Sequence, residues 1–81
     1  METWVTYKDL IKQLPKSFKD KNRYYELQIN YDSGRGCWRV CYEYVNNCDN
    51  RKYEHFNEDL CEALKSTLLD YEDENNRTDT I

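Results

Sequence analysis

The chain has 81 residues, a net charge of −4 and twelve aromatic side chains, eight of which are tyrosines. A domain of this size buries only about 60% of its unfolded surface, so a deep active site has little room, and the aromatic content argues against a disordered chain. No apolar run approaches the length of a membrane span and no charged and then apolar leader opens the sequence, so we expect a cytoplasmic protein with no membrane partner.

The first predicted element is a two-turn helix that begins at about Tyr7. Thr6 and Asp9 have the spacing of a capping box, and Pro15 ends the helix. The apolar side chains that recur with the helical period are Tyr7, Leu10, Ile11 and Leu14. Residues 16–22 (KSFKDKN) are predicted to form a basic connector to the first strand.

Residues 23–45 predict a β-hairpin, because two long alternations of apolar and polar residues flank a turn of sequence DSGR. Gly34 is expected to supply the positive φ of this turn. The resulting register sets Glu26 opposite Cys41, whereas a slip of two residues would create an unfavourable pair with Glu43. The predicted apolar face consists of Tyr25, Leu27, Ile29, Tyr31, Trp38, Val40, Tyr42 and Tyr44.

A third, shorter strand is predicted over residues 51–56, after a turn over residues 46–50. Its facing stays open at this point. Either Tyr53 and His55 point inward and Phe56 points outward, or the reverse holds.

A second helix is predicted after Asn57, which is a good N-cap, and it is expected to end near Tyr71 or Glu72. Its apolar stripe consists of Leu60, Cys61, Leu64, Thr67, Leu68 and Tyr71. Leu64 and Leu68 are expected to cover a core made of Leu27, Ile29, Trp38 and Val40. Residues 73–81 have no apolar period and are predicted to be a disordered acidic tail.

The predicted fold class is therefore α+β in the order α-β-β-β-α, with a three-stranded antiparallel meander sheet. Because the sheet has one apolar face and each helix one apolar stripe, both helices are expected to pack on that face. Residues 1–72 would form a single domain, and the other face of the sheet would be open.

The cysteines and the single histidine are the residues from which a metal site or a nucleophilic centre would be built. Their spacing is Cys37-x3-Cys41-x6-Cys48-x6-His55-x5-Cys61. The C-x2-C pairs that place two thiolates on one zinc ion are missing, and Cys41 with His55 lacks a third group to orient the imidazole. Cys37 and Cys41 are about 13 Å apart along one strand, too far for a mutual disulfide. We therefore expect free thiols, with Cys37 and Cys41 on the sheet surface, no metal or other cofactor, no small-molecule substrate, no catalytic residues and no enzymatic activity.

The charge is polarised along the chain. Residues 1–23 carry six basic and three acidic side chains, which gives +3, whereas residues 57–81 carry eight acidic and two basic side chains, which gives −6. This gradient predicts two alternative binding surfaces of opposite sign.

The basic alternative is a nucleic-acid-binding domain. Its candidate residues are Lys12, Lys16, Lys19, Lys21 and Arg23. The predicted element order resembles that of double-stranded RNA-binding domains, but those domains carry a lysine-rich segment at the start of their second helix. Here that position reads Asn57-Glu58-Asp59, so acid stands where base is needed.

The acidic alternative fits the charge better. Its candidate partner-binding residues are Glu58, Asp59, Glu62, Asp70, Glu72, Asp73 and Glu74. A row of carboxylates can compete for a protein groove that is built to bind phosphates. In size, element order and acidic C-terminal segment the chain resembles small phage-encoded inhibitors of the anti-CRISPR and DNA-mimic kind. The resemblance implies a non-enzymatic inhibitor whose partner is a nucleic-acid-binding protein.

Self-association is also expected. An uncovered sheet face that carries Tyr24, Arg39, Glu26, Gln28 and Glu43, or an exposed edge strand, would suit a second copy of the chain as well as a foreign partner. We therefore predict a homodimer.

Overall fold

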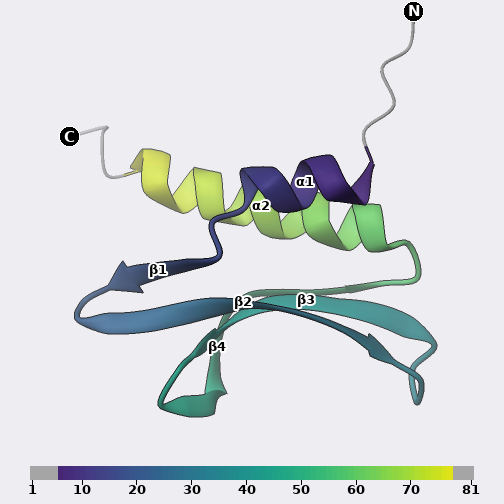
Figure 1. Cartoon of the computed structure of the whole chain (residues 1–81), viewed down its shortest axis with the longest axis horizontal. Coiled ribbons are helices and arrows are strands. Elements are labelled where there is room, and N and C mark those ends of the chain that lie inside the picture. Colours follow the sequence, from purple (N-terminus) through teal and green to yellow (C-terminus); the bar gives the residue numbers. More distant parts are fainter. Residues whose placement is uncertain (1–5, 78–81) are drawn as a thin grey trace, which may run out of the picture.

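The computed structural model describes residues 6–77 and has two layers, a curved sheet and a pair of helices on one face of it (Figure 1). The elements are α1 (Tyr7–Gln13), β1 (Ser17–Asp20), β2 (Arg23–Asp32), β3 (Cys37–Tyr44), β4 (Asn47–Asn57) and α2 (Leu60–Arg77). The sheet is antiparallel with strand order β1-β2-β3-β4. The α+β class, the meander and the placement of both helices on one face are confirmed, but the predicted number of strands is wrong.

The missed strand is β1, which lies within the predicted basic connector. It pairs with the start of β2 from Ser17 opposite Glu26 to Asp20 opposite Arg23. The two strands are joined by Lys21 and Asn22, which have positive φ values of 52° and 70°. Two consecutive left-handed residues make a tight hairpin turn, but neither residue is glycine, so the composition does not signal it.

The β2–β3 hairpin has a different register from the predicted one. Asp32 pairs with Cys37, which leaves a four-residue loop, and Glu26 lies opposite Glu43. The left-handed residue of the loop is Gly36, with a φ of 67°, and its N–H donates to the carbonyl of Asp32 at 2.8 Å. The loop is thus two residues longer than the DSGR turn predicts, and every cross-strand pair shifts by two.

β4 begins at Asn47, within the stretch that was predicted to be a turn, and the chain reverses at residues 45–46. Its pairing with β3 contains a bulge, because one residue of β3 separates the partners of Lys52 and His55. Tyr53 lies in this bulge with a φ of 56°. Tyr53 and His55 face the helices, whereas Phe56 is exposed, so the first of the two predicted facings is correct.

α1 has the predicted bounds and the predicted capping box of Thr6 and Asp9. α2 begins at Leu60, and the carboxylate of Asp59 accepts a hydrogen bond from the N–H of Cys61 at 2.9 Å. The predicted end of α2 near Tyr71 is wrong, because the helix continues to Arg77. The predicted tail is therefore helical over residues 73–77, and residues 78–81 lie outside the described part of the chain.

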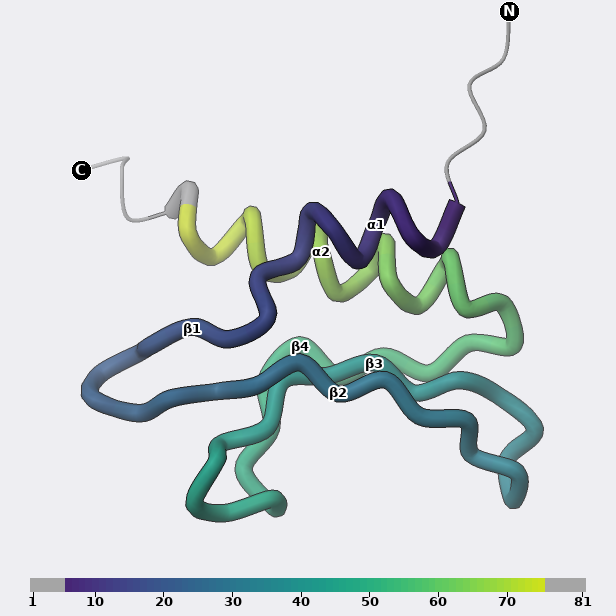
Figure 2. Tube along the Cα trace, in the orientation of Figure 1, coloured from purple at the N-terminus to yellow at the C-terminus, as the bar shows by residue number. Residues whose placement is uncertain are grey.

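The core lies between the helices and the middle of the sheet. Its buried members are Leu10, Leu14, Tyr25, Val40, Tyr42, Ala63, Leu64 and Leu68. Leu27 and Ile29 pack against this cluster, but Trp38 does not join it and instead contacts Tyr31 edge to face. The β2–β3 loop end of the sheet curves away from the helices (Figure 2), and this curvature leaves Tyr31 54% exposed.

Candidate functional site

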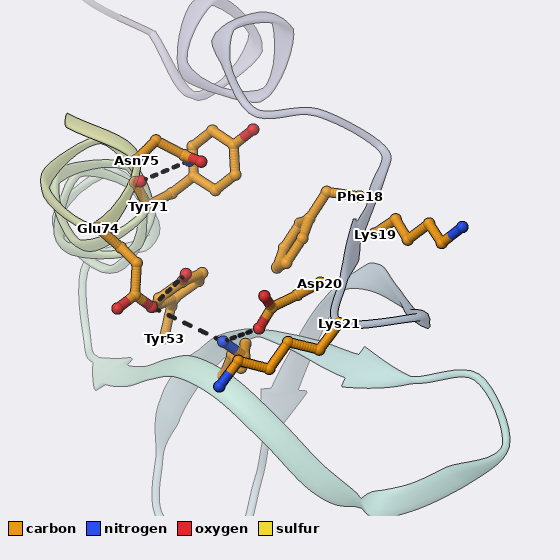
Figure 3. A pocket seen from close by; sticks show the side chains of 9 residues that line it. Phe18, Lys19, Asp20, Lys21, Tyr53, Tyr71, Glu74 and Asn75 are labelled. Carbon is orange, nitrogen blue, oxygen red and sulfur yellow. Dashed lines mark hydrogen bonds and ion pairs between the residues drawn. The ribbon is translucent and has the colours of Figure 1, made fainter. Parts of the chain in front are cut away.

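A cavity of about 380 Å³ lies between the β1–β2 turn, the bulge of β4 and the C-terminal half of α2 (Figure 3). Its lining residues are Phe18, Lys19, Asp20, Lys21, Lys52, Tyr53, Tyr71, Glu74 and Asn75. The ring of Phe18 lies 5.9 Å from that of Tyr53 and 5.4 Å from that of Tyr71, so the three aromatic side chains form a contiguous apolar wall.

The bulge of β4 determines which groups face this cavity. The extra residue places Lys52 and Tyr53 on the same side of the strand, where regular alternation would place them on opposite sides. The left-handed backbone of Tyr53 is held by α2, because its carbonyl accepts from the Thr67 hydroxyl at 3.1 Å and its own hydroxyl donates to Glu74 at 2.8 Å. Burial, together with the hydrogen bond to Glu74, raises the pKa of Tyr53 well above its usual value.

Three charged groups of the cavity form one ion-pair cluster. The Lys52 ammonium lies 2.6 Å from the Asp20 carboxylate and 3.7 Å from that of Glu74. Burial lowers the pKa of Lys52, but the hydrogen bond with Asp20 and the two negative charges outweigh it, so the net shift is upward. The same hydrogen bond lowers the pKa of Asp20. Asp20 from the basic N-terminal segment and Glu74 from the acidic C-terminal segment thus share Lys52 as a partner.

The seven acidic residues that were predicted to form a binding row differ in whether their side chains make contacts within the fold. Asp70 and Glu74 turn toward the sheet, where Asp70 contacts the His55 ring at 2.5 Å, and Asp59 caps α2. All seven are exposed, and Asp73 lines a hollow together with Tyr53, Asp70 and Glu74. The four that take no part in the contacts just described are Glu58, Glu62, Glu72 and Asp73. Asp70 and Glu74 are therefore tied into the fold, and the row that can meet a partner is shorter than predicted.

Leu69 is a surface residue that the sequence analysis missed. It is 65% exposed, more than any other large apolar side chain in the described part of the chain. By the helical period it shares the outer face of α2 with three acids, Glu62, Glu72 and Asp73, and with Lys65, which pairs with Glu62. The available signal was that Leu69 is an apolar residue of this helix outside the predicted stripe.

The five predicted basic residues do not form one surface. Lys12 is on α1 and Lys16 precedes β1, whereas Lys21 lines the cavity. Lys19 lies over the ring of Tyr24 at 5.6 Å, and Arg23 lies over that of Tyr44 at 5.4 Å. Lys19 and Arg23 are on opposite faces of the sheet because they belong to adjacent cross-strand pairs.

Comparison of the chain with protein families, with curated proteins and with solved structures finds no match. Within residues 6–77 no helix is both long and apolar enough to cross a membrane.

The cysteines are free but are not placed as predicted. Cys37 and Cys41 are buried rather than on the surface, and Cys41 has an exposed fraction of 0%. Burial raises the pKa of the Cys41 thiol to about 11. Val40 faces the helices opposite His55, so its neighbour Cys41 points to the other face of the sheet and the two cannot form a nucleophile–base pair. In the described part of the chain, no three potential metal ligands come together.

Cys41 is buried because the face of the sheet opposite the helices is not bare. Arg39 lies within 3.5 Å of the Glu43 and Glu54 carboxylates, and Arg51 lies 3.3 Å from Glu43. These four charged side chains are the electrostatic neighbours of the thiol. The predicted mixed surface on this face is thus in part a network of paired charges, in which Arg39 and Glu43 have partners, whereas Glu26 is exposed.

Proposed function

We propose that this protein is a non-enzymatic inhibitor that binds the basic, nucleic-acid-binding surface of another protein through the outer face of α2. The observation that carries the proposal is the 65% exposure of Leu69 on the same helical face as Glu62, Glu72 and Asp73. An exposed leucine within an acidic row has the composition of an interface with an apolar centre and a charged rim.

The directions of the acids support a division of roles. Asp59, Asp70 and Glu74 have partners within the fold, so they stabilise the helix and its contact with β4. Glu62, Glu72 and Asp73 are exposed, so the field of their charges can reach an approaching basic groove. Glu62 has an exposed contact with Lys65 at 3.4 Å, and such surface pairs contribute little and exchange readily.

The test compares two sets of charge reversals. Immobilised protein is used to capture nucleic-acid-binding proteins from a bacterial lysate, the source that the resemblance to phage inhibitors suggests, and the affinity of each captured protein is then measured with purified components. The variant Glu62→Lys/Glu72→Lys/Asp73→Lys should weaken binding by roughly 0.5 to 2 kcal/mol per well-placed charge, mainly through slower association, and the loss should shrink as salt rises. Free DNA should compete.

Two further variants complete the design. Leu69→Ala should weaken binding by more than about 1 kcal/mol if this side chain is the apolar centre. Lys16→Glu/Lys19→Glu/Lys21→Glu is the matched control on the basic segment and should leave binding intact.

The second candidate is direct nucleic-acid binding. The contact of Lys19 with Tyr24, a residue that is 54% exposed, favours it, because a cation beside an exposed aromatic residue suits a phosphate and a stacked base. Salt-sensitive binding of the wild-type protein to DNA or RNA that is lost in the lysine variant would install this function and overturn the inhibitor proposal.

A further inference from the structure

The outer edge of β2 is only partly covered. β1 pairs with residues 23–26 of this ten-residue strand, and the N–H of Leu27 donates to the carbonyl of Lys16 at 3.0 Å. Lys16 immediately precedes β1, and the residues before it lead away from the sheet to α1 (Figure 2). Within residues 6–77 no strand pairs with the edge of β2 over residues 28–32.

The direction of the main-chain groups along this edge follows from two hydrogen bonds. Leu27 directs its N–H toward β1, whereas Tyr24 directs its carbonyl toward β3, where Val45 donates to it at 3.0 Å. Successive residues of a strand alternate in this direction. Ile29 and Tyr31 therefore point their N–H and carbonyl groups outward, and Gln28 and Asn30 point theirs at β3.

This edge lacks the features that protect other edges. Residues 28–31 (QINY) contain no proline, glycine or charged side chain, and their pairing with β3 is regular. The free edge of β4, in contrast, is interrupted by the bulge at Tyr53 and carries Arg51, Lys52 and Glu54. A regular, uncharged edge with exposed main-chain groups is a site for strand addition.

We propose that a second copy of this chain occupies the edge, so that the β2 strands of the two copies pair antiparallel about a two-fold axis at Asn30. In this register Ile29 of each copy lies opposite Tyr31 of the other, and each such pair exchanges two hydrogen bonds. Moving the axis one residue toward Leu27 places Tyr31 opposite Leu27 of the second copy, whose N–H is already bonded to the carbonyl of Lys16. Moving it one residue the other way places Ile29 opposite the loop residue Ser33. Only the axis at Asn30 gives the outward main-chain groups of both Ile29 and Tyr31 hydrogen-bond partners in the second copy.

Side chains and charges fit the same register. The exposed ring of Tyr31 comes beside Ile29 of the second copy, which is an aromatic–β-branched cross-strand pair. Lys16, which immediately precedes β1, comes beside Asp32 of the second copy, so opposite charges meet at both ends of the interface. The Asn30 side chains that meet at the axis are neutral, and each accepts from its own Arg39 at 3.0 Å.

The edge is distinct from the surface of the proposed function. It belongs to the sheet layer, whereas Leu69 and its acidic neighbours lie on α2 (Figure 1). Dimerisation and inhibitor activity can therefore succeed or fail separately. A dimer joined through β2 would present two α2 surfaces to a partner.

The experiment measures mass and amide protection over a concentration series of the full chain. Sedimentation velocity should show a concentration-dependent shift from monomer to dimer. Over the same series, hydrogen exchange by NMR should slow at the amides of Ile29 and Tyr31, whereas that of Asn30, already bonded to β3, should change little. A monomer at every concentration with fast exchange at both amides would overturn the proposal.

Variants separate this edge from other contacts. Tyr31→Pro removes an N–H that no strand within residues 6–77 uses, and because the change occurs in both copies it should weaken the dimer about tenfold or more. Tyr31→Ala, which keeps the N–H, should weaken it less. Lys16→Glu, which sets two carboxylates together, should weaken it as well. A circular dichroism spectrum of each variant at low concentration confirms the folded monomer. A dimer that Tyr31→Pro and Lys16→Glu leave unchanged would show that another surface is used and would overturn the proposal.

Discussion

Glu26 lies directly opposite Glu43 in the β2–β3 ladder, although like charges in this relation repel. Glu43 is neutralised by Arg39 at 3.4 Å and Arg51 at 3.3 Å, and Glu26 is exposed to water. The pair persists because the four-residue loop sets this register, which also places the fully buried Val40 opposite Ile29 on the other face of the hairpin.

Relieving this repulsion should stabilise the protein. Glu26→Lys places a positive charge opposite Glu43 and should raise the free energy of unfolding by roughly 0.2 to 1 kcal/mol, measured by urea denaturation. Glu26→Gln, which only removes a charge, should give a smaller gain, and added salt should reduce the difference between the two variants. A lysine variant no more stable than the glutamine variant at low salt would contradict the assigned register.

The hydroxyl of Thr67 should be worth more than its methyl group. It is fully buried and donates to the carbonyl of Tyr53 at the strained bulge. Thr67→Val keeps the shape but leaves that carbonyl without its donor, so we expect a loss of about 1 to 3 kcal/mol in the free energy of unfolding. Thr67→Ser keeps the donor and should retain the bulge contact, which the Tyr53 amide shift would report. Equal amide shifts in the valine and serine variants would contradict this role.

Truncation of two leucines of α2 should change the stability of the protein by very different amounts. Leu64 is fully buried in the core cluster, so Leu64→Ala should cost about 2 to 5 kcal/mol in a denaturation experiment. Leu69→Ala, on the exposed face of the same helix, should change stability by less than about 0.5 kcal/mol. A large cost at Leu69 would mean that a further segment covers it and would remove it from the proposed binding surface.

The cysteines should differ in their reactivity toward a thiol reagent. Cys48 is exposed, whereas Cys41 is buried and its pKa is raised to about 11, so almost none of it is thiolate at pH 8. Peptide mapping after brief alkylation should find Cys48 modified first and Cys41 last. Unfolding in denaturant should make the rates similar. Rapid alkylation of Cys41 in the folded protein would show that the charged network over it opens readily.

The hairpin shows why one part of the fold could be predicted and its register could not. A shift of two residues leaves every side chain on the same face of the sheet, so the alternation that identifies the strands is compatible with either register. The length of the loop decides between them. DSGR has the composition of a short turn, but the positive φ is at Gly36, one residue beyond that sequence.

The candidate site was predictable only in part. Its acidic residues could be named from the sequence, but their directions depend on what α2 packs against. Asp70 and Glu74 are drawn inward by His55, Lys52 and the Tyr53 hydroxyl, all of which belong to β4. The bulge that brings Lys52 and Tyr53 to one side carries no glycine, so no local signal announces it.

The sequence by itself determined the α+β class, the capping box of α1, the apolar faces of β2 and β3 and the buried stripe of α2, because each depends on the period of side chains within one element. Only the tertiary structure decided the presence of β1, the cross-strand register, the burial of Cys41 and the separation of inward from outward acids. These features depend on contacts between segments far apart in the chain. Lys52, Asp20 and Glu74 meet because the fold brings three distant segments together, and this arrangement joins charges that the sequence keeps apart.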